Sequence, residues 1–167
     1  MPFDVKCKLW PNGKECFFAH KTLQPMKQAG PRCVVTALAI LTDSTPEIFE
    51  GHVNTQDPIS WSEALKPFGM KLAYCPSDIR KLRFYVEELI GLDDLFLLCY
   101  YSPTDAKMLG DPDERGWICG SHVVILHRDH IIDPRRGDAI HALDHDCLNH
   151  HTKRLFRVLP VNHPRGI

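Results

Sequence analysis

One segment of the chain would be apolar on every side if it formed a helix. It reads Cys33-Val-Val-Thr-Ala-Leu-Ala-Ile-Leu-Thr42 and carries no charged side chain. Its Ala and Leu content favours a helix, although the pair Val34-Val35 would also suit a strand. A helix that is hydrophobic all round has to be covered on all sides. The chain is therefore expected to build other structure around this segment.

Several later segments are typical of strands. The continuous apolar run Leu95–Tyr101 indicates a buried strand. Residues 121–127 and 130–133 are expected to form a hairpin around Arg128-Asp129. Strands are also expected over 70–74 and 153–161. Three helices are expected to start at Thr45, at the capping box Ser60-Trp-Ser-Glu63 and near Ile79, and to end at Gly51, Gly69 and Gly91, respectively. Helices followed by mostly antiparallel strands predict an α+β fold.

The first twenty residues have the pattern of a hairpin. Apolar and polar residues alternate from Phe3 to Leu9, residues 11–14 contain a Pro-Asn-Gly turn signal, and residues 16–18 read as a returning strand. A hairpin over residues 1–20 is therefore expected. Because no repeat or linker divides the rest, residues 1–167 are expected to form a single domain.

Composition excludes several classes of protein. The chain has 167 residues, of which 44% are hydrophobic and 25% charged, as in globular domains and not in disordered or fibrous chains. The formal net charge of -1 gives no reason to expect nucleic acid or a membrane as a partner. The start of the sequence has no signal-peptide pattern and no apolar run is long enough to span a bilayer. A cytoplasmic location is expected, with signal-independent export as an effector left open.

Cys33 is a candidate nucleophile. It lies where a loop containing Gly and Pro meets the apolar helix, so its thiol would feel the positive end of the helix dipole and unpaired backbone N–H groups. Both effects favour the thiolate. The alternative is an inert core cysteine. The chain holds seven cysteines, an odd number without a Cys-x-x-Cys pair, which favours reduced thiols over a disulfide framework.

His122 and Asp133 are candidate partners for that thiol. A two- or four-residue loop in the expected hairpin pairs Leu126 with Ile131 and sets Val124 opposite Asp133. Since side chains alternate between the two faces of a strand, His122 and Asp133 would then be diagonal neighbours on one face. A carboxylate in that place can orient an imidazole and stabilise its cation. The alternative for His122 is a structural histidine.

Three segments together resemble the papain-like cysteine peptidases, most closely the bacteriocin-leader-processing peptidase family and its single-domain relatives. They are Gln28-Ala-Gly-Pro-Arg-Cys33, His122-Val-Val-Ile-Leu126 and Ile131-Ile-Asp-Pro-Arg-Arg-Gly137, and the resemblance covers about residues 24–143. It implies a papain-like fold in which a nucleophile helix packs on a mostly antiparallel sheet. It also implies Cys33 as nucleophile, His122 as general base, Asp133 as third member and Gln28 as oxyanion-hole donor, with Gln24 as the other candidate.

The resemblance implies a cysteine hydrolase, most simply a peptidase, that acts on a peptide or protein and needs no cofactor. The same site would be a transglutaminase if an amine replaced water, and a deamidase if the substrate were a Gln side chain. In the family the Gln usually lies six residues before the Cys, where this chain has Lys27, and Gly follows the Cys, where this chain has Val34. A catalytically impaired binding module on the same fold is therefore an alternative.

A third hypothesis is a zinc-stabilised interaction domain. His and Cys residues are frequent at both ends of the chain, which is a pattern of metal sites. Their spacing fits no structural zinc pattern, so a polar surface segment is the simpler interpretation and no metal is expected. The residues concerned are Cys7, Cys16 and His20 near the start, and His141, His145, Asp146, Cys147, His150 and His151 near the end.

Overall fold

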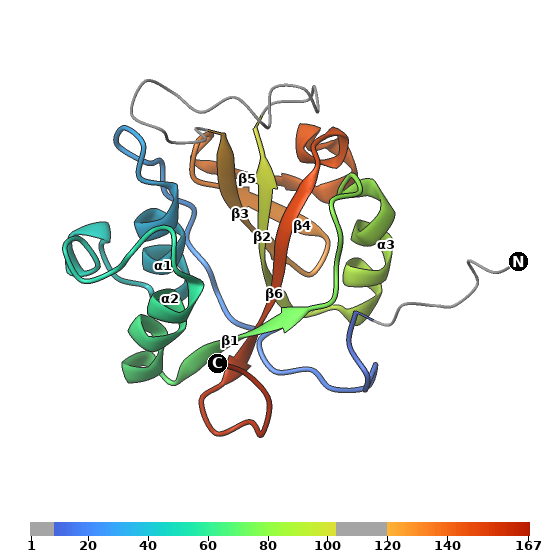
Figure 1. Cartoon of the computed structure of the whole chain (residues 1–167), viewed down its shortest axis with the longest axis horizontal. Coiled ribbons are helices and arrows are strands. Elements are labelled where there is room, and N and C mark those ends of the chain that lie inside the picture. The colour runs from blue at the N-terminus through green and yellow to red at the C-terminus, as the bar shows by residue number, and fades with distance from the viewer. Residues whose placement is uncertain (1–8, 103–119) are drawn as a thin grey trace, which may run out of the picture.

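The computed structural model describes residues 9–102 and 120–167, which form an α+β fold around a six-stranded antiparallel sheet (Figure 1). The strands are ordered β1-β6-β2-β3-β4-β5 across the sheet. The α-helices of the described residues are α1 (Cys33–Thr42), α2 (Pro58–Leu65) and α3 (Arg83–Leu92), and the strands are β1 (Met70–Cys75), β2 (Leu95–Tyr101), β3 (Ser121–His127), β4 (His130–Asp133), β5 (Asp138–His141) and β6 (Thr152–Pro160). Short 3-10 helices span Pro46–Ile48, Lys66–Phe68, Ala142–Asp144 and Asp146–Asn149.

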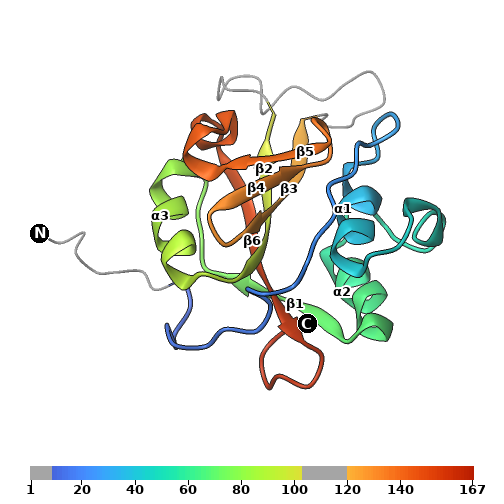
Figure 2. The ribbon, with the colours of Figure 1, turned by 180° about the vertical axis from the view of Figure 1, so that it is seen from behind.

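Helices cover both faces of the sheet. Figures 1 and 2 show α1 and α2 on one side and α3 on the other. Strand β2 serves both layers, because Leu95, Leu97 and Cys99 pack with α1 while Phe96, Leu98 and Tyr100 pack with α3. Helix α1 is buried at each position from Val34 to Leu41, as its apolar sequence predicted. None of the helices in the described part of the chain has the length and apolar character that a membrane crossing needs.

The hairpin of β3 and β4 has the predicted register. A two-residue loop, Arg128-Asp129, joins the strands, and Leu126 pairs with Ile131. Arg128 makes the tight turn in a left-handed conformation, with φ of 59°. Its backbone N–H donates to Asp94 O at 2.8 Å, which ties the turn to the start of β2. The hairpin therefore sets Asp133 at the end of β4, beside the first residues of β3.

Three helix boundaries differ from the prediction. Helix α3 begins at Arg83 and not near Ile79, because Lys81 instead forms an antiparallel bridge with His151. The capping box at Ser60 is wrong, because α2 begins at Pro58 and Asp57 Oδ1 accepts the N–H of Ile59 at 3.0 Å. Proline suits the first turn of a helix, and an aspartate before it is a better cap than a serine inside the helix. Helix α3 continues through Gly91 to Leu92, because Asp93 takes the left-handed capping conformation at φ of 52°.

The described part of the N-terminal segment lacks the second strand of the predicted hairpin. Residues 1–8 lie outside the described residues, and residues 9–20 contain no strand. The predicted returning strand over residues 16–18 is wrong, because the N–H groups of Phe17 and Phe18 donate to the carboxylate of Asp94, at 2.9 and 2.7 Å. A buried side chain thus takes the place of a neighbouring strand as their hydrogen-bond acceptor.

Candidate active site

Cys33 is the first residue of α1 and lies where that helix meets β3. It is partly exposed, whereas the eight residues that follow it in the helix are buried. Its thiol interacts with the imidazole of His122 and with the backbone amides of Val123 and Val34. The loop that precedes α1 and the first residues of β3 therefore bring together the thiol and the imidazole that the sequence singled out.

The pKa of the Cys33 thiol is lowered although the residue is largely buried. Burial alone would raise this pKa, but the imidazole of His122 and the two backbone amides outweigh it. Burial raises the pKa of Cys75 and of Cys99 to about 12, because neither thiol has an imidazole partner to counter it. Thiols with a lowered pKa and access to solvent are the reactive ones in proteins, and inert thiols lie in apolar surroundings. Cys33 has the first kind of environment.

His122 connects the thiol to a buried carboxylate. Its Nε2 lies 2.7 Å from Asp133 Oδ1, so Nδ1 is the ring nitrogen left for Cys33. The two side chains are almost fully buried, with 1% of that of His122 and 5% of that of Asp133 exposed. Burial alone would lower the pKa of His122, but its interactions with Asp133 and Cys33 outweigh burial and raise this pKa. A raised imidazole pKa beside a lowered thiol pKa favours the thiolate–imidazolium pair.

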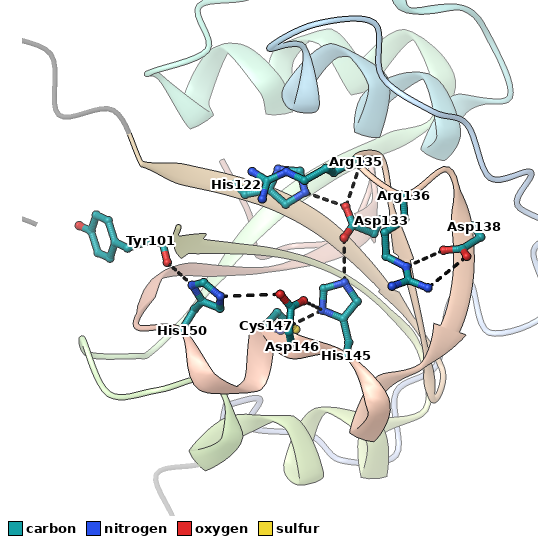
Figure 3. Close-up of polar contacts among 10 residues, drawn as sticks. All are labelled: Tyr101, His122, Asp133, Arg135, Arg136, Asp138, His145, Asp146, Cys147 and His150. Carbon is teal, nitrogen blue, oxygen red and sulfur yellow. Dashed lines mark hydrogen bonds and ion pairs between the residues drawn. The ribbon is translucent and has the colours of Figure 1, made fainter. Parts of the chain in front are cut away.

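Asp133 receives a second imidazole on its other oxygen (Figure 3). His145 Nε2 lies 2.8 Å from Oδ2, while the backbone N–H of Arg135 donates to Oδ1 at 2.8 Å. Burial alone would raise the pKa of Asp133, but the hydrogen bonds from His122 and His145 outweigh it and hold this pKa well below its usual range. Asp133 is thus an ionised carboxylate with a donor on each oxygen.

The sequence did not reveal His145 as a partner of Asp133. The sequence pattern places it in a polar, His-rich segment and gives no indication of strand β5. With β5 in place, the chain runs back along β4 and enters the short 3-10 helices that bring His145 over Asp133. Gly137, whose backbone adopts a left-handed conformation, is the feature of the sequence that could have indicated this reversal of the chain.

Gln28 lies next to the turn that follows Asp133. Its backbone N–H donates to Pro134 O at 2.7 Å, and a Cβ placed on Gly137 would lie 2.7 Å from Lys27 Cβ. The side-chain Nε2 of Gln28 donates to Gly30 O at 2.8 Å. The Asp-Pro-x-x-Gly turn therefore holds the loop that leads into Cys33, and an oxyanion-hole role for Gln28 stays a prediction. Gln24, the other candidate, is exposed.

The histidines near the C-terminus have partners other than a metal. Within residues 9–102 and 120–167, no three His, Cys, Asp or Glu side chains converge in a way that would hold a metal ion. His141 Nδ1 accepts the N–H of Leu143 at 3.2 Å, and His150 Nδ1 lies 2.8 Å from Tyr101 O. Hydrogen bonds to the backbone thus account for these rings.

Comparisons of the chain with family models, with curated proteins and with solved structures found no match. The chemistry of these side chains is therefore the basis on which a function has to be argued.

Proposed function

We propose that this protein is a cysteine hydrolase of papain-like fold that cleaves an amide bond of a peptide or protein. Cys33 is the nucleophile, His122 the general base and acid, and Asp133 the residue that orients the imidazole. The observation that carries the proposal is a partly exposed thiol of lowered pKa whose imidazole partner is itself bonded to a buried carboxylate. A nucleophile helix on one face of an antiparallel sheet is compatible with the papain-like arrangement.

The first half of the reaction forms a thioester. His122 takes the proton of Cys33, and the thiolate sulfur attacks the carbonyl carbon of the substrate. Negative charge moves to the carbonyl oxygen, where the N–H of Cys33 at the start of α1 is a suitable donor, since the first N–H groups of a helix have no intrahelical partner. The second hydrogen on the side-chain amide nitrogen of Gln28 is the other donor that we propose for this oxygen. The imidazolium of His122 then protonates the amine, which leaves.

The second half returns the enzyme to its starting state. His122 removes a proton from water, the hydroxide adds to the thioester, and the carbon–sulfur bond breaks to release the acid. The proton on His122 returns to the sulfur of Cys33. Asp133 stabilises the imidazolium in both halves without taking its proton.

Alkylation of the thiols tests whether Cys33 and His122 form a reactive pair. The rate of carboxamidomethylation by iodoacetamide is measured at each cysteine between pH 5 and 9 by peptide mass spectrometry. Cys16, an exposed thiol whose Sγ faces Asp93 O, is the internal reference. Below neutral pH we expect Cys33 to react about tenfold faster than Cys16, because a thiol of lowered pKa is more ionised there. Equal rates, or a rate at Cys33 that His122→Ala leaves unchanged, would show the proposal to be wrong.

Products show which amide is attacked. A mixture of peptides is incubated with the protein and with its Cys33→Ala variant, and the masses are compared. Fragments that depend on Cys33 indicate a peptidase. Conversion of Gln to Glu indicates a deamidase, and linkage to an added amine indicates a transglutaminase. A Cys33 that is inert to iodoacetamide in the folded protein would favour a binding module instead.

A further inference from the structure

Two histidines cap neighbouring 3-10 helices in the same manner but differ in where their second nitrogen points. His141 Nδ1 accepts the N–H of Leu143 at 3.2 Å, and His145 Nδ1 accepts the N–H of Cys147 at 2.9 Å. The His141 side chain is 38% exposed, whereas that of His145 is 1% exposed. Capping alone does not require burial, so the burial of His145 needs another explanation.

The hydrogen bonds of His145 define which nitrogen carries its proton. Since Nδ1 accepts the N–H of Cys147, the proton lies on Nε2, and Nε2 points at Asp133 Oδ2 from 2.8 Å away. His145 therefore donates to Asp133. The ring of His122 approaches the other carboxylate oxygen, so that Asp133 is held between two imidazoles (Figure 3).

We propose that His145 is a positioning residue of the hydrolase, which holds the Asp133 carboxylate so that Oδ1 stays aligned with His122 Nε2. The inference rests on the proposed function, because alignment matters only if His122 and Cys33 act as a pair. In this arrangement the active site consists of Cys33, His122 and Asp133, with His145 acting through Asp133 and touching neither the thiol nor the substrate.

The environment of Asp133 indicates what the loss of His145 would do. Oδ1 keeps the N–H of Arg135, whereas Oδ2 would be left buried without its donor, which is unfavourable for a charged oxygen. The carboxylate relieves this cost by turning towards another donor or by taking up a proton. Either change weakens its support of the His122 cation, so the thiolate of Cys33 would form at a higher pH.

Other charged and titratable groups surround these residues and stay in place in the variants below. Asp146 Oδ1 lies 3.3 Å from His145 Nδ1 on the solvent side. The Tyr100 ring packs edge-on against His122, with ring centroids 5.6 Å apart. Arg135, Arg136 and Asp138 lie beyond Asp133. Cys147 follows Asp146 in the chain, and His150 lies beside Asp146. Arg83, Glu87 and Asp144 line the hollow beside His145.

The test follows the pH dependence of Cys33 alkylation in three variants. In His145→Phe, which keeps a ring but loses the donor, we expect the acid limb to move up by about one pH unit, which is about a tenfold slower reaction near pH 5. In His145→Gln, whose amide N–H can reach Oδ2, we expect most of the wild-type profile to return. In His141→Phe, which loses an equivalent cap but no contact with Asp133, we expect no shift.

The outcomes separate this inference from the proposed function. If wild-type Cys33 has no His122-dependent reactivity, the proposed function fails. If it has that reactivity and His145→Phe leaves the profile unchanged or moves it to lower pH, only the role of His145 fails. The tautomer is also measured in the unmutated protein by ¹⁵N NMR of the histidine rings, which does not depend on the folding of a variant. A proton on Nδ1 of His145 would overturn the inference.

Discussion

Two buried aspartates, Asp133 and Asp94, have the same number of hydrogen-bond donors but different kinds of donor. Asp133 is bonded by two imidazoles and one backbone N–H. Asp94 is bonded by the guanidinium of Arg157, at 2.6 Å, and by the backbone N–H groups of Phe17 and Phe18. Both carboxylates are thus satisfied, as buried charges need to be.

The difference lies in whether the partners can change their charge. Arginine keeps its charge over the whole pH range in which imidazoles titrate, and backbone amides do not titrate. The partners of Asp94 therefore keep the same charge throughout that range. Imidazoles gain and lose a proton near neutral pH. The Asp133 site therefore suits proton transfer, and the Asp94 site suits the attachment of the N-terminal segment. A buried ion pair is in itself no sign of catalysis, and the titrating partner is what distinguishes the candidate active site.

The largest effect is expected at the Asp94 site, on stability alone. In Arg157→Met the carboxylate of Asp94 loses its buried cation, and removing one partner of such a pair costs about 3–5 kcal/mol. The cation also lies 4.9 Å from the Trp10 ring and 5.2 Å from the Phe17 ring, so packing of the N-terminal segment is lost with it. Urea denaturation measures the change in the free energy of unfolding.

An exposed ion pair close by provides the control. Arg128 Nε lies 2.9 Å from Asp93 Oδ1, with both side chains about half exposed. We expect Arg128→Met to leave stability almost unchanged, since solvent screens such pairs. The comparison of the two sites would break down if Arg157→Met shifted the pH profile of Cys33 alkylation in the folded protein, because the Asp94 site would then be coupled to the thiol.

A smaller effect on stability is expected at Asp133, and it depends on pH. The pKa of Asp133 is lower in the folded protein than in the unfolded chain, so its ionised form stabilises the fold above about pH 4, and this contribution is lost as the pH falls through the folded pKa. The raised pKa of His122 adds no slope there, since its contribution is fully present below its unfolded pKa. Asp133→Asn removes the carboxylate, so the wild-type advantage, about 2 kcal/mol at neutral pH, should shrink in acid.

The same variant links stability to reactivity. Because the amide that replaces the carboxylate in Asp133→Asn carries no charge to support the His122 cation, alkylation of Cys33 near pH 6 should slow by about tenfold or more. Unfolding curves at several pH values between 2 and 7 and the alkylation rate are measured on the same preparations. A wild-type advantage that stayed constant from neutral to acid pH would mean that the Asp133 carboxylate is not stabilised by its histidines.

The sequence predicted the candidate active site better than the rest of the fold, for a physical reason. Helix α1 and strands β2 and β3 are apolar runs, and a two-residue turn joins β3 to β4. Local sequence pattern is therefore enough to predict these elements and the register that brings His122 next to Asp133. Strand β5 has 4 residues, none of them buried, and has no such pattern. Local windows also miss contacts between distant residues, such as Arg157 with Asp94, 63 positions apart.

The N-terminal segment is the clearest case of this limit. Residues 16–18 have strand-like composition, but the structure that they adopt depends on Asp94, which lies 76 and 77 positions away from Phe18 and Phe17. Propensity favours a strand only where a neighbouring strand is available, and a buried carboxylate competes for the same N–H groups. The long-range acceptor decided the outcome, and composition could not show it.

The smallest effect is expected where the loop before Cys33 meets the turn after Asp133. Gly137 has φ of 78° and its missing Cβ would lie 2.7 Å from Lys27 Cβ, whereas Gly69 has φ of 81° and open space around it. Both glycine-to-alanine changes carry the cost of a left-handed side chain, but Gly137→Ala also crowds Lys27. We expect Gly137→Ala to destabilise the fold by about 1–2 kcal/mol more than Gly69→Ala.

This pair of variants also shows whether the turn controls the position of the thiol. Gly137→Ala pushes the loop of residues 24–32 away from Pro134, to which Gln28 N–H donates, so the start of α1 should shift relative to His122. Alkylation of Cys33 should then slow in Gly137→Ala and keep its wild-type rate in Gly69→Ala, as measured below pH 7. If the two variants reacted alike, the contact between Gly137 and Lys27 would serve the stability of the turn and not the alignment of the thiol with its imidazole.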